Sequence, residues 1–561
     1  MKIRIASPRR SNIAIGVAVS LISVFLVGPV YGADTLVNAQ PLVQPVDIPE
    51  VAPLPFTAVA AGTFTVPATM VNLILTPNQG VVGDKFTVSG VGLPASTSLQ
   101  LTWGTSTGTW ISDVEPSTVN YNGISFTKVT VNMATVTTDA SGTFSLATKV
   151  PADFGGVHDI YAVVNGAAVA HAGFQINRTL TVTPTSGPIG TPITVTYTGM
   201  GASLYTAGGS VHYDNLYAGE EQAIWTRGVG KVVIYASGPR GVHYVNVGNA
   251  IGFRYLNVIQ SPIPYTNGGS VAFTVTKDQG ISKPTQTFPA VVTPTSNLHT
   301  TLTNTGLDPN TQAVMTLSTS SGPILTKVNV KTTKVIADGT YQLVWSTVVG
   351  NRVNCPTSTC WAFSSIPLGT ATVVNGSASN NVTIPDNLGG WHVIQMMKGN
   401  VIEAQTPFYV KQSIMPFFDA NGKQIGLGLA KFDPSVVPDV VARGQAGEPA
   451  TTFKAGEDFT ISIKGVGWTQ FDNTLAVTYD NSYIGYGCGF NSNGYMVVRL
   501  KATGAPGTHI IDLHPLLYTN QPSFANTPYG MLPVLTSDRD FPALALGYQI
   551  PSYHFSIKIS R

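Results

Sequence analysis

The clearest shortage in this 561-residue sequence is of charged residues. Asp, Glu, Lys and Arg make up 10% of the chain, against about 25% in ordinary soluble domains. The formal net charge is +2, so the chain has neither the basic surface that nucleic acid requires nor an acidic tail. A surface with so few charges favours close contact with other surfaces, because few ions have to be desolvated.

The residues that build amphipathic helices are also scarce. No segment beyond the N-terminus repeats its apolar residues with a long helical period. The chain instead contains 57 Gly and 38 Pro, and Thr, Ser, Val and Asn fill much of the rest. Short alternating stretches between turn residues predict β-strands, so we expect an all-β protein.

Long apolar runs are missing except near the N-terminus, where basic residues precede an apolar stretch from Ile13 to Val27. This pattern predicts a signal peptide over residues 1–32 and an exported protein, extracellular or at the cell surface. An uncleaved signal anchor is the alternative, since the apolar run approaches the length that spans a membrane. Regularly spaced prolines predict an extended linker over residues 33–70, with an ordinary disordered leader as the alternative.

Cysteine is rare, with three residues in the chain. In an exported protein the short spacing of Cys355 and Cys360 predicts a disulfide that closes a small loop. Metal binding is the alternative, but no second pair of ligands lies at the required spacing, so we expect no metal and no cofactor. Cys488 is expected to be a buried, inert thiol, with an intermolecular bridge as the alternative.

What the chain does contain is a repeat. A Gly-x-His tripeptide followed by a short apolar-alternating run occurs four times, which indicates a tandem array of related units. The histidines of the four copies are His158, His243, His392 and His509. Gly, two polar or turn residues, a large apolar residue, Thr and then Val or Ile mark the start of the units, for example at Gly83 and Gly190.

The units fall into two types. The second and fourth share the motif Tyr-Asp-Asn-x-Tyr-x-Gly, whereas the first and third share other segments. We therefore expect a duplicated two-domain block, with the order A, B, A′, B′. The expected β-sandwich domains are A (71–176), B (177–286), A′ (287–412) and B′ (413–561).

The ends of the units resemble a known family. Asp139 to Phe144, then Val150-Pro151, then the strand from Gly156 resemble the closing half of bacterial and archaeal cell-surface immunoglobulin-like repeats of the IPT/TIG kind. The segment Thr183 to Val195 fits the opening half. The resemblance implies immunoglobulin-like sandwiches and a role as an adhesin, an envelope or S-layer component, or a spacer module of an exported enzyme.

The repeated histidines are expected to be structural, because four separate domains would each contribute one ligand without co-ligands. The B-type domains carry the best candidates for ligand binding, although Tyr-Asp-Asn is also typical of a strand that runs into a turn. Asp512 and His514 fall on one face of a strand, where they could bond to one another or share a cation. The candidate residues are Tyr213, Asp214, Asn215, Tyr479, Asp480, Asn481, Asp512 and His514.

The sequence contains no Gly-x-Ser-x-Gly elbow, His-Glu-x-x-His motif or P-loop, so we expect no enzyme. The favoured interpretation is an exported cell-surface structural or adhesive protein, an envelope or S-layer-like component. Its expected partners are other envelope or surface proteins, including further copies of itself. The alternatives are a carbohydrate-binding surface protein that uses the B-type domains on cell-wall or extracellular glycans, and an exported enzyme with an unrecognised active site.

Overall fold

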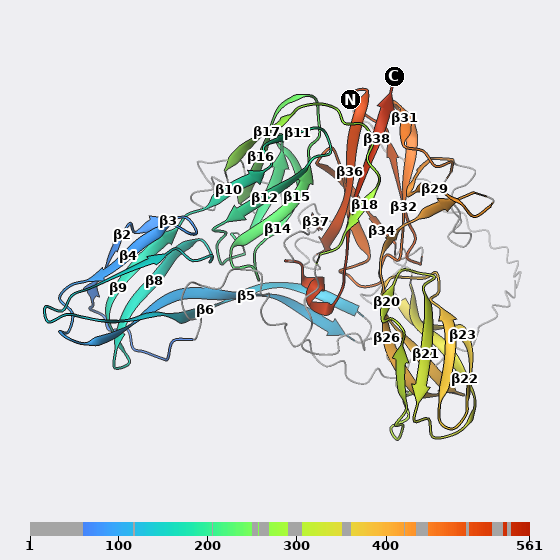
Figure 1. Cartoon of the computed structure of the whole chain (residues 1–561), viewed down its shortest axis with the longest axis horizontal. Coiled ribbons are helices and arrows are strands. Elements are labelled where there is room, and N and C mark those ends of the chain that lie inside the picture. The colour runs from blue at the N-terminus through green and yellow to red at the C-terminus, as the bar shows by residue number, and fades with distance from the viewer. Residues whose placement is uncertain are drawn as a thin grey trace, which may run out of the picture. The chain divides into compact units, whose positions relative to one another are not determined.

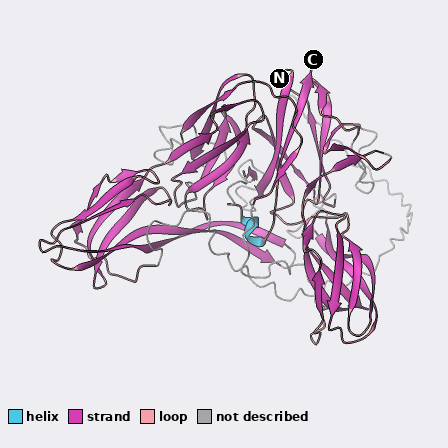
Figure 2. Cartoon of the chain, viewed as in Figure 1, coloured by secondary structure: helices cyan, strands magenta, loops and turns pink. Residues whose placement is uncertain are grey.

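The computed structural model describes residues 60–115, 118–204, 206–249, 256, 269–289, 306–350, 361–419, 421–433, 447–489, 493–518, 531–535 and 540–561. Strands dominate this part of the chain, and its one helical element is the short 3₁₀ helix η7 (Pro542–Leu546) (Figure 2). The predicted all-β fold is confirmed. The predicted signal peptide, residues 33–59 of the predicted linker, and both Cys355 and Cys360 lie outside the described residues.

Within the described residues, no helix has both the length and the apolar character needed to cross a membrane.

The strands form pairs of sheets that pack face to face, which confirms the predicted tandem array of β-sandwiches. In Figure 1 the colour follows the chain through them, from blue and cyan through green and yellow to orange and red. Each sandwich has its own alternation of buried and exposed residues. In the strand Lys85–Gly90, for example, Phe86 and Val88 are buried while their neighbours are not. This two-residue period is what places one face of each strand in a core.

Domain A contains one sheet with the order β1-β9-β8-β5-β6, in which β3 also pairs with β9, and a second sheet with the order β2-β4-β7. The bounds are β1 (Val71–Asn72), β2 (Ile74–Thr76), β3 (Gln79–Gly80), β4 (Lys85–Gly90), β5 (Ser98–Glu115), β6 (Thr118–Thr137), β7 (Phe144–Lys149), β8 (Gly156–Val164) and β9 (Ala167–Ile176).

Domain B repeats this plan with sheets β11-β17-β16-β13-β14 and β10-β12-β15. The bounds are β10 (Thr179–Thr183), β11 (Ser186–Gly187), β12 (Pro192–Thr198), β13 (Gly208–Tyr213), β14 (Leu216–Gln222), β15 (Val229–Tyr235), β16 (Gly241–Asn249) and β17 (Ser270–Val275).

Domain A′ contains sheets β20-β26-β25-β22-β23 and β19-β21-β24. The bounds are β19 (Val314–Leu317), β20 (Ser321–Gly322), β21 (Lys327–Thr333), β22 (Gly339–Gly350), β23 (Trp361–Val373), β24 (Ala378–Thr383), β25 (Gly390–Lys398) and β26 (Val401–Val410).

Domain B′ has the order β18-β38-β36-β33-β34 in its larger sheet, where β31 also pairs with β38 and β37 with β36; the facing sheet has the order β27-β32-β30, with β35 on β32. The strand β18 precedes all the strands of domain A′ in the sequence, yet it pairs with β38 of domain B′. The bounds are β18 (Thr285–Thr287), β27 (Ser413–Ile414), β28 (Pro416–Phe418), β29 (Gln424–Leu427), β30 (Leu429–Lys431), β31 (Thr452–Lys454), β32 (Asp458–Lys464), β33 (Thr474–Tyr479), β34 (Ser482–Cys488), β35 (Met496–Lys501), β36 (Gly507–Tyr518), β37 (Met531–Pro533) and β38 (Ser552–Ser560).

The joint between A and B recurs between A′ and B′. Gly155 forms a parallel bridge with Gly201, and Gly389 forms the same bridge with Gly467. A Cβ atom on Gly155 would lie 1.8 Å from the main-chain oxygen of Gly199, and one on Gly389 would lie 1.6 Å from that of Gly465. Only glycine allows the two backbones to approach so closely, so this joint explains the Gly-Gly pair that precedes both A-type histidines.

Candidate functional site: the Tyr-Asp-Asn turns and the junction of domains B and B′

The two Tyr-Asp-Asn motifs form the same hairpin turn. Tyr213 pairs with Leu216 between β13 and β14, and Tyr479 pairs with Ser482 between β33 and β34. The Asp and Asn between them have φ angles of 50° and 65° in the first turn and 48° and 63° in the second. Two consecutive positive φ angles are typical of a type I′ turn, for which Asn and Asp are among the favoured residues.

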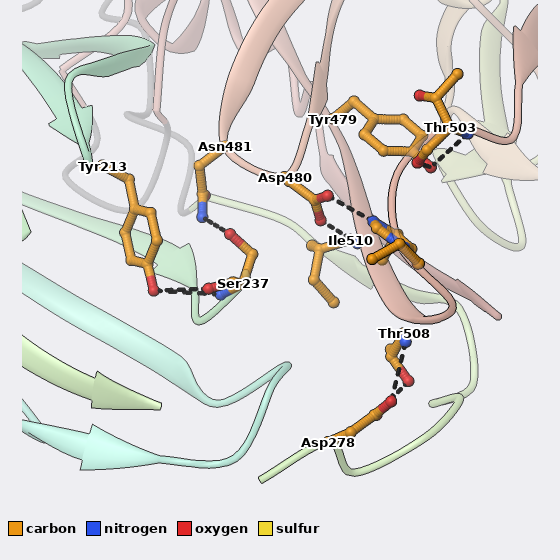
Figure 3. Close-up of polar contacts among 11 residues, drawn as sticks. Tyr213, Ser237, Asp278, Tyr479, Asp480, Asn481, Thr503, Thr508 and Ile510 are labelled. Carbon is orange, nitrogen blue, oxygen red and sulfur yellow. Dashed lines mark hydrogen bonds and ion pairs between the residues drawn. The ribbon is translucent and has the colours of Figure 1, made fainter. Parts of the chain in front are cut away.

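The aspartate of each turn ties the hairpin to the next strand of the sheet. Oδ1 of Asp480 accepts a hydrogen bond from the main-chain nitrogen of Ile510 at 2.9 Å (Figure 3). Oδ2 of Asp480 lies 2.6 Å from Nδ1 of His509. Asp214 makes the matching contacts with Tyr244 and His243. The B-type histidines are therefore partners of the turn aspartates.

The electrostatics of this pair favour a protonated histidine. The second ring nitrogen of His509, Nε2, lies 2.8 Å from the main-chain oxygen of Ala505, so both ring nitrogens face acceptors. Burial of the ring opposes the charged form, but the hydrogen bond to Asp480 and the one to Ala505 outweigh it and raise the pKa of His509 above its ordinary value. An imidazolium satisfies both acceptors at once.

The A-type histidines are held differently. His158 stacks on Trp103 with ring centroids 4.6 Å apart, and its two nitrogens lie 2.8 and 2.6 Å from the main-chain oxygens of Gly104 and Phe154. His392 stacks on Trp345 at 4.7 Å and also faces main-chain oxygens. Burial lowers the pKa of His392 to about 4, so this ring is neutral at pH 7. The structural role expected for all four histidines stays a prediction that substitution can test.

The expected pairing of Asp512 with His514 is wrong. Oδ1 of Asp512 lies 2.7 Å from Nδ1 of His554, and His514 instead contacts Ser552. The reason is the pairing of β36 with β38, which places His554 directly opposite Asp512. A cross-strand partner is about 5 Å away, closer than the next residue on the same face of one strand. Among the described residues, no cluster of three or more His, Cys, Asp or Glu side chains could hold a metal ion.

The turn of domain B′ forms a junction with domain B. Nδ2 of Asn481 donates to the main-chain oxygen of Tyr235 at 2.7 Å and to Oγ of Ser237 at 2.9 Å (Figure 3). Beside this contact, the ring of His554 stacks on Tyr235 with centroids 3.7 Å apart. Asn481 is buried, so its amide is committed to this contact and is unavailable to an external ligand.

Apolar side chains complete the same junction. Ile510 and Leu535 of domain B′ belong to the core cluster of domain B, and Ile510 is 1% exposed. The Cδ1 atom of Ile510 would lie 3.9 Å from a Cβ atom on Gly190. Asp278, on the segment that leaves domain B, accepts a hydrogen bond from the main-chain nitrogen of Thr508 at 3.1 Å (Figure 3). No local pattern in the sequence indicates this junction, because its partners lie on different domains.

The tyrosines of the two motifs are also committed to the fold. The hydroxyl of Tyr213 donates to the main-chain oxygen of Ser237 at 2.9 Å, and that of Tyr479 donates to Thr503 at 2.7 Å. Burial raises the pKa of Tyr479 to about 12. Of the predicted ligand-binding residues, Asn215 lies on an exposed turn and Asp214 is partly exposed.

Cys488 is exposed, so the expectation of a buried thiol is wrong. It lies at the end of the edge strand β34, where burial alternates along the strand. This alternation turns Ile484, Tyr486 and Cys488 outward. An edge strand has no neighbour on one side to cover such a residue.

The fold and the junction define an all-β protein of tandem sandwiches in which motif residues connect the domains. The sequence matches no protein-family model, and it has no significant match among curated proteins.

Solved structures resemble it only loosely. The native conformation of E. coli alpha-2-macroglobulin aligns with 86% of this chain at 10% identity and a TM-score of 0.16, and this chain spans only 30% of its length. A putative membrane anchored protein from Corynebacterium diphtheriae aligns with 60% of this chain and 89% of its own, at 10% identity and a TM-score of 0.15. Three domains of the bacteriophage RB49 outer capsid protein Hoc align with 60% of this chain and 96% of their own, at 10% identity and a TM-score of 0.13. Scores this low carry no argument, so the fold rests on its strand pairing.

Proposed function

We propose that this chain is an exported, non-enzymatic structural or adhesive protein of the cell surface, an envelope or S-layer-like component built from immunoglobulin-like repeats similar to the IPT/TIG kind. The observation that carries the proposal concerns the Tyr-Asp-Asn-x-Tyr-x-Gly motif, the most specific motif in the chain. The polar groups of Tyr479, Asp480 and Asn481 bond to neighbouring strands and to domain B. A motif used in this way holds domains together, as a mechanical component requires.

Two features of the sequence support the location. The N-terminal residues have the pattern of an export signal, and the thinly charged surface suits contact with other surfaces. The carbohydrate-binding alternative is weakened for domain B′, because the Asn481 amide and the Asp480 carboxylate that a sugar would need are already bonded to Tyr235 of domain B and to His509.

Surface labelling of intact cells tests the proposal. A membrane-impermeant amine reagent should label this chain on whole cells, and mild protease treatment should release fragments of it without lysis. Electron microscopy of isolated envelopes should then show the chain in the outermost layer. Recovery of the unlabelled chain only after lysis would contradict the proposal, and turnover of a substrate in a broad hydrolase screen would favour the enzyme alternative.

A further inference from the structure

Residues 190–244 of domain B correspond one to one with residues 456–510 of domain B′ (456 − 190 = 266 and 510 − 244 = 266). Each residue at the B–B′ junction can therefore be compared with the equivalent residue of the other domain. The surface of domain B′ that enters the junction, here called the donor side, contains Asn481 and Ile510. The equivalent residues of domain B are Asn215 and Tyr244. On the acceptor side, the residues Gly190, Tyr235 and Ser237 of domain B correspond to Gly456, Lys501 and Thr503 of domain B′.

The donor side of the junction is buried in domain B′ and bare in domain B. Ile510 is 1% exposed, whereas its counterpart Tyr244 is 52% exposed. Two further apolar residues of this surface, Leu216 and Val242, are also exposed. Domain B therefore presents a turn of the same geometry as the docked one, surrounded by apolar side chains that water covers. Exposed apolar groups gathered next to a preformed polar contact are typical of an interaction surface.

The acceptor side shows the reverse pattern. Ser237 of domain B is 1% exposed because Asn481 covers it, whereas Thr503 of domain B′ is exposed. A Cβ atom on Gly190 would contact Ile510, whereas one on Gly456 would meet no atom within 4 Å. Thr503 keeps the hydroxyl that Ser237 uses as an acceptor. Both domains therefore have a position that can accept an asparagine amide, and only the one in domain B is occupied, by Asn481.

The hydrogen bonds that shape the acceptor are the same in both domains. Tyr213 donates its hydroxyl proton to Ser237, and Tyr479 donates its own to Thr503. Lys501 takes the place of Tyr235, and its ammonium pairs with Asp458 at 2.8 Å and donates to the main-chain oxygen of Gly456 at 3.0 Å.

We propose that domain B of one copy of this chain docks on domain B′ of a second copy. Asn215, Leu216 and Tyr244 form the donor surface, and Gly456, Lys501 and Thr503 form the acceptor surface. The two surfaces meet as Asn481 and Ile510 meet domain B within one chain. Because the two surfaces differ, the contact is heterologous, and a pair of associated copies keeps one free donor surface and one free acceptor surface. Such contacts generate open filaments or closed rings. The inference rests on the proposed structural role and names its partner.

Mixing two variants of the full chain tests this inference. Tyr244→Glu removes the donor surface and Thr503→Arg blocks the acceptor, and both side chains are exposed. In sedimentation velocity the unmodified chain should grow in mass with concentration, and each variant alone should associate at least about tenfold more weakly. An equimolar mixture should form species of two chains and none larger, since one intact donor meets one intact acceptor.

Val157→Glu is the matched control, because Val157 is an exposed residue on the Gly-x-His strand of domain A, away from both surfaces. It should associate as the unmodified chain does, and Leu216→Lys should repeat the effect of Tyr244→Glu if that variant unfolds. The inference is overturned if the unmodified chain stays monomeric, if Tyr244→Glu associates normally, or if the mixture stays monomeric. A monomeric chain that surface labelling still finds on cells would overturn this inference alone, whereas an associating chain found only inside cells would overturn the proposed function.

Discussion

The indole nitrogen of Trp110 donates a hydrogen bond of 2.9 Å to Oδ1 of Asp540, which lies 430 residues further along the chain. Trp110 lies on β5 of domain A, yet it is buried in the core cluster that otherwise consists mainly of domain B′ residues. Oδ2 of Asp540 accepts from the main-chain nitrogen of Trp225 at 3.0 Å and from Oγ1 of Thr226 at 3.2 Å. One carboxylate thus connects domains A, B and B′, and its burial raises its pKa to about 6.

Replacement of Trp110 by Phe should destabilise this connection. The ring would still fill most of the space, but Asp540 would lose a donor while it remains buried, which costs about 1–3 kcal/mol. Trp110→Ala should cost about 3–5 kcal/mol, since it also leaves a cavity. Thermal unfolding followed by circular dichroism would measure both. Equal stability of Trp110→Phe and the unmodified chain would show that the bond contributes nothing.

Asp472 should destabilise the joint between A′ and B′ at high pH. Burial raises its pKa to about 7, and its Oδ1 accepts two hydrogen bonds from Thr469. The unfolded chain ionises this group near pH 4, so stability should fall as the pH rises from about 4 to about 7. Asp472→Asn removes the ionisation and should be more stable than the unmodified chain by about 2–4 kcal/mol at about pH 8. The gap should shrink at about pH 4.5, and a gap independent of pH would contradict this account.

His392 should make the chain acid-sensitive. Its folded-state pKa is about 4 because the ring is buried, whereas in the unfolded chain the value is about 6.5. As the pH falls from about 6.5 to about 4, this histidine is protonated in the unfolded chain but not in the folded one. The free energy of unfolding therefore falls by about 3 kcal/mol. His392→Gln has no such proton, so its stability relative to the unmodified chain should rise over this interval in denaturant titrations. Parallel pH profiles for the two proteins would exclude the effect.

The pair of His509 and Asp480 should respond to pH in the opposite sense. Because the pKa of His509 is raised in the folded state, the contribution of the pair is fully present below the unfolded-state pKa of about 6.5 and is lost as the pH rises through the higher folded value. Asp480→Asn keeps an oxygen for the main chain of Ile510 but removes the charge. It should lower the melting temperature more at about pH 5.5 than at about pH 9, and an equal effect at both pH values would contradict this account.

Cys488 should react in the native protein, because its side chain is exposed. A thiol reagent added without denaturant should modify it, and mass spectrometry of the digested chain would locate the label. Cys355 and Cys360 should stay unlabelled if they form the predicted disulfide, and they should become labelled after reduction. Failure to label Cys488 in the native chain would contradict the exposed position.

Local residue chemistry was enough to predict much of this protein from its sequence. Alternation such as that of Phe86 and Val88 fixes which face of a strand is buried, and the Asp-Asn pair is enough to indicate a turn, since these residues tolerate positive φ angles. Both signals act over a few residues, so the strands, the turns and the tandem organisation could be inferred before any contact between domains was known.

Only the tertiary structure decided what the turns do. Asn215 and Asn481 occupy the same turn position and have nearly the same φ angle, yet one is exposed and the other is buried against Tyr235 and Ser237. Likewise, nothing near Asp512 in the sequence indicated His554, and nothing near Trp110 indicated Asp540. These pairings depend on which strands become neighbours and which domains meet, and that outcome is set by surfaces distant in the sequence, which no local pattern encodes.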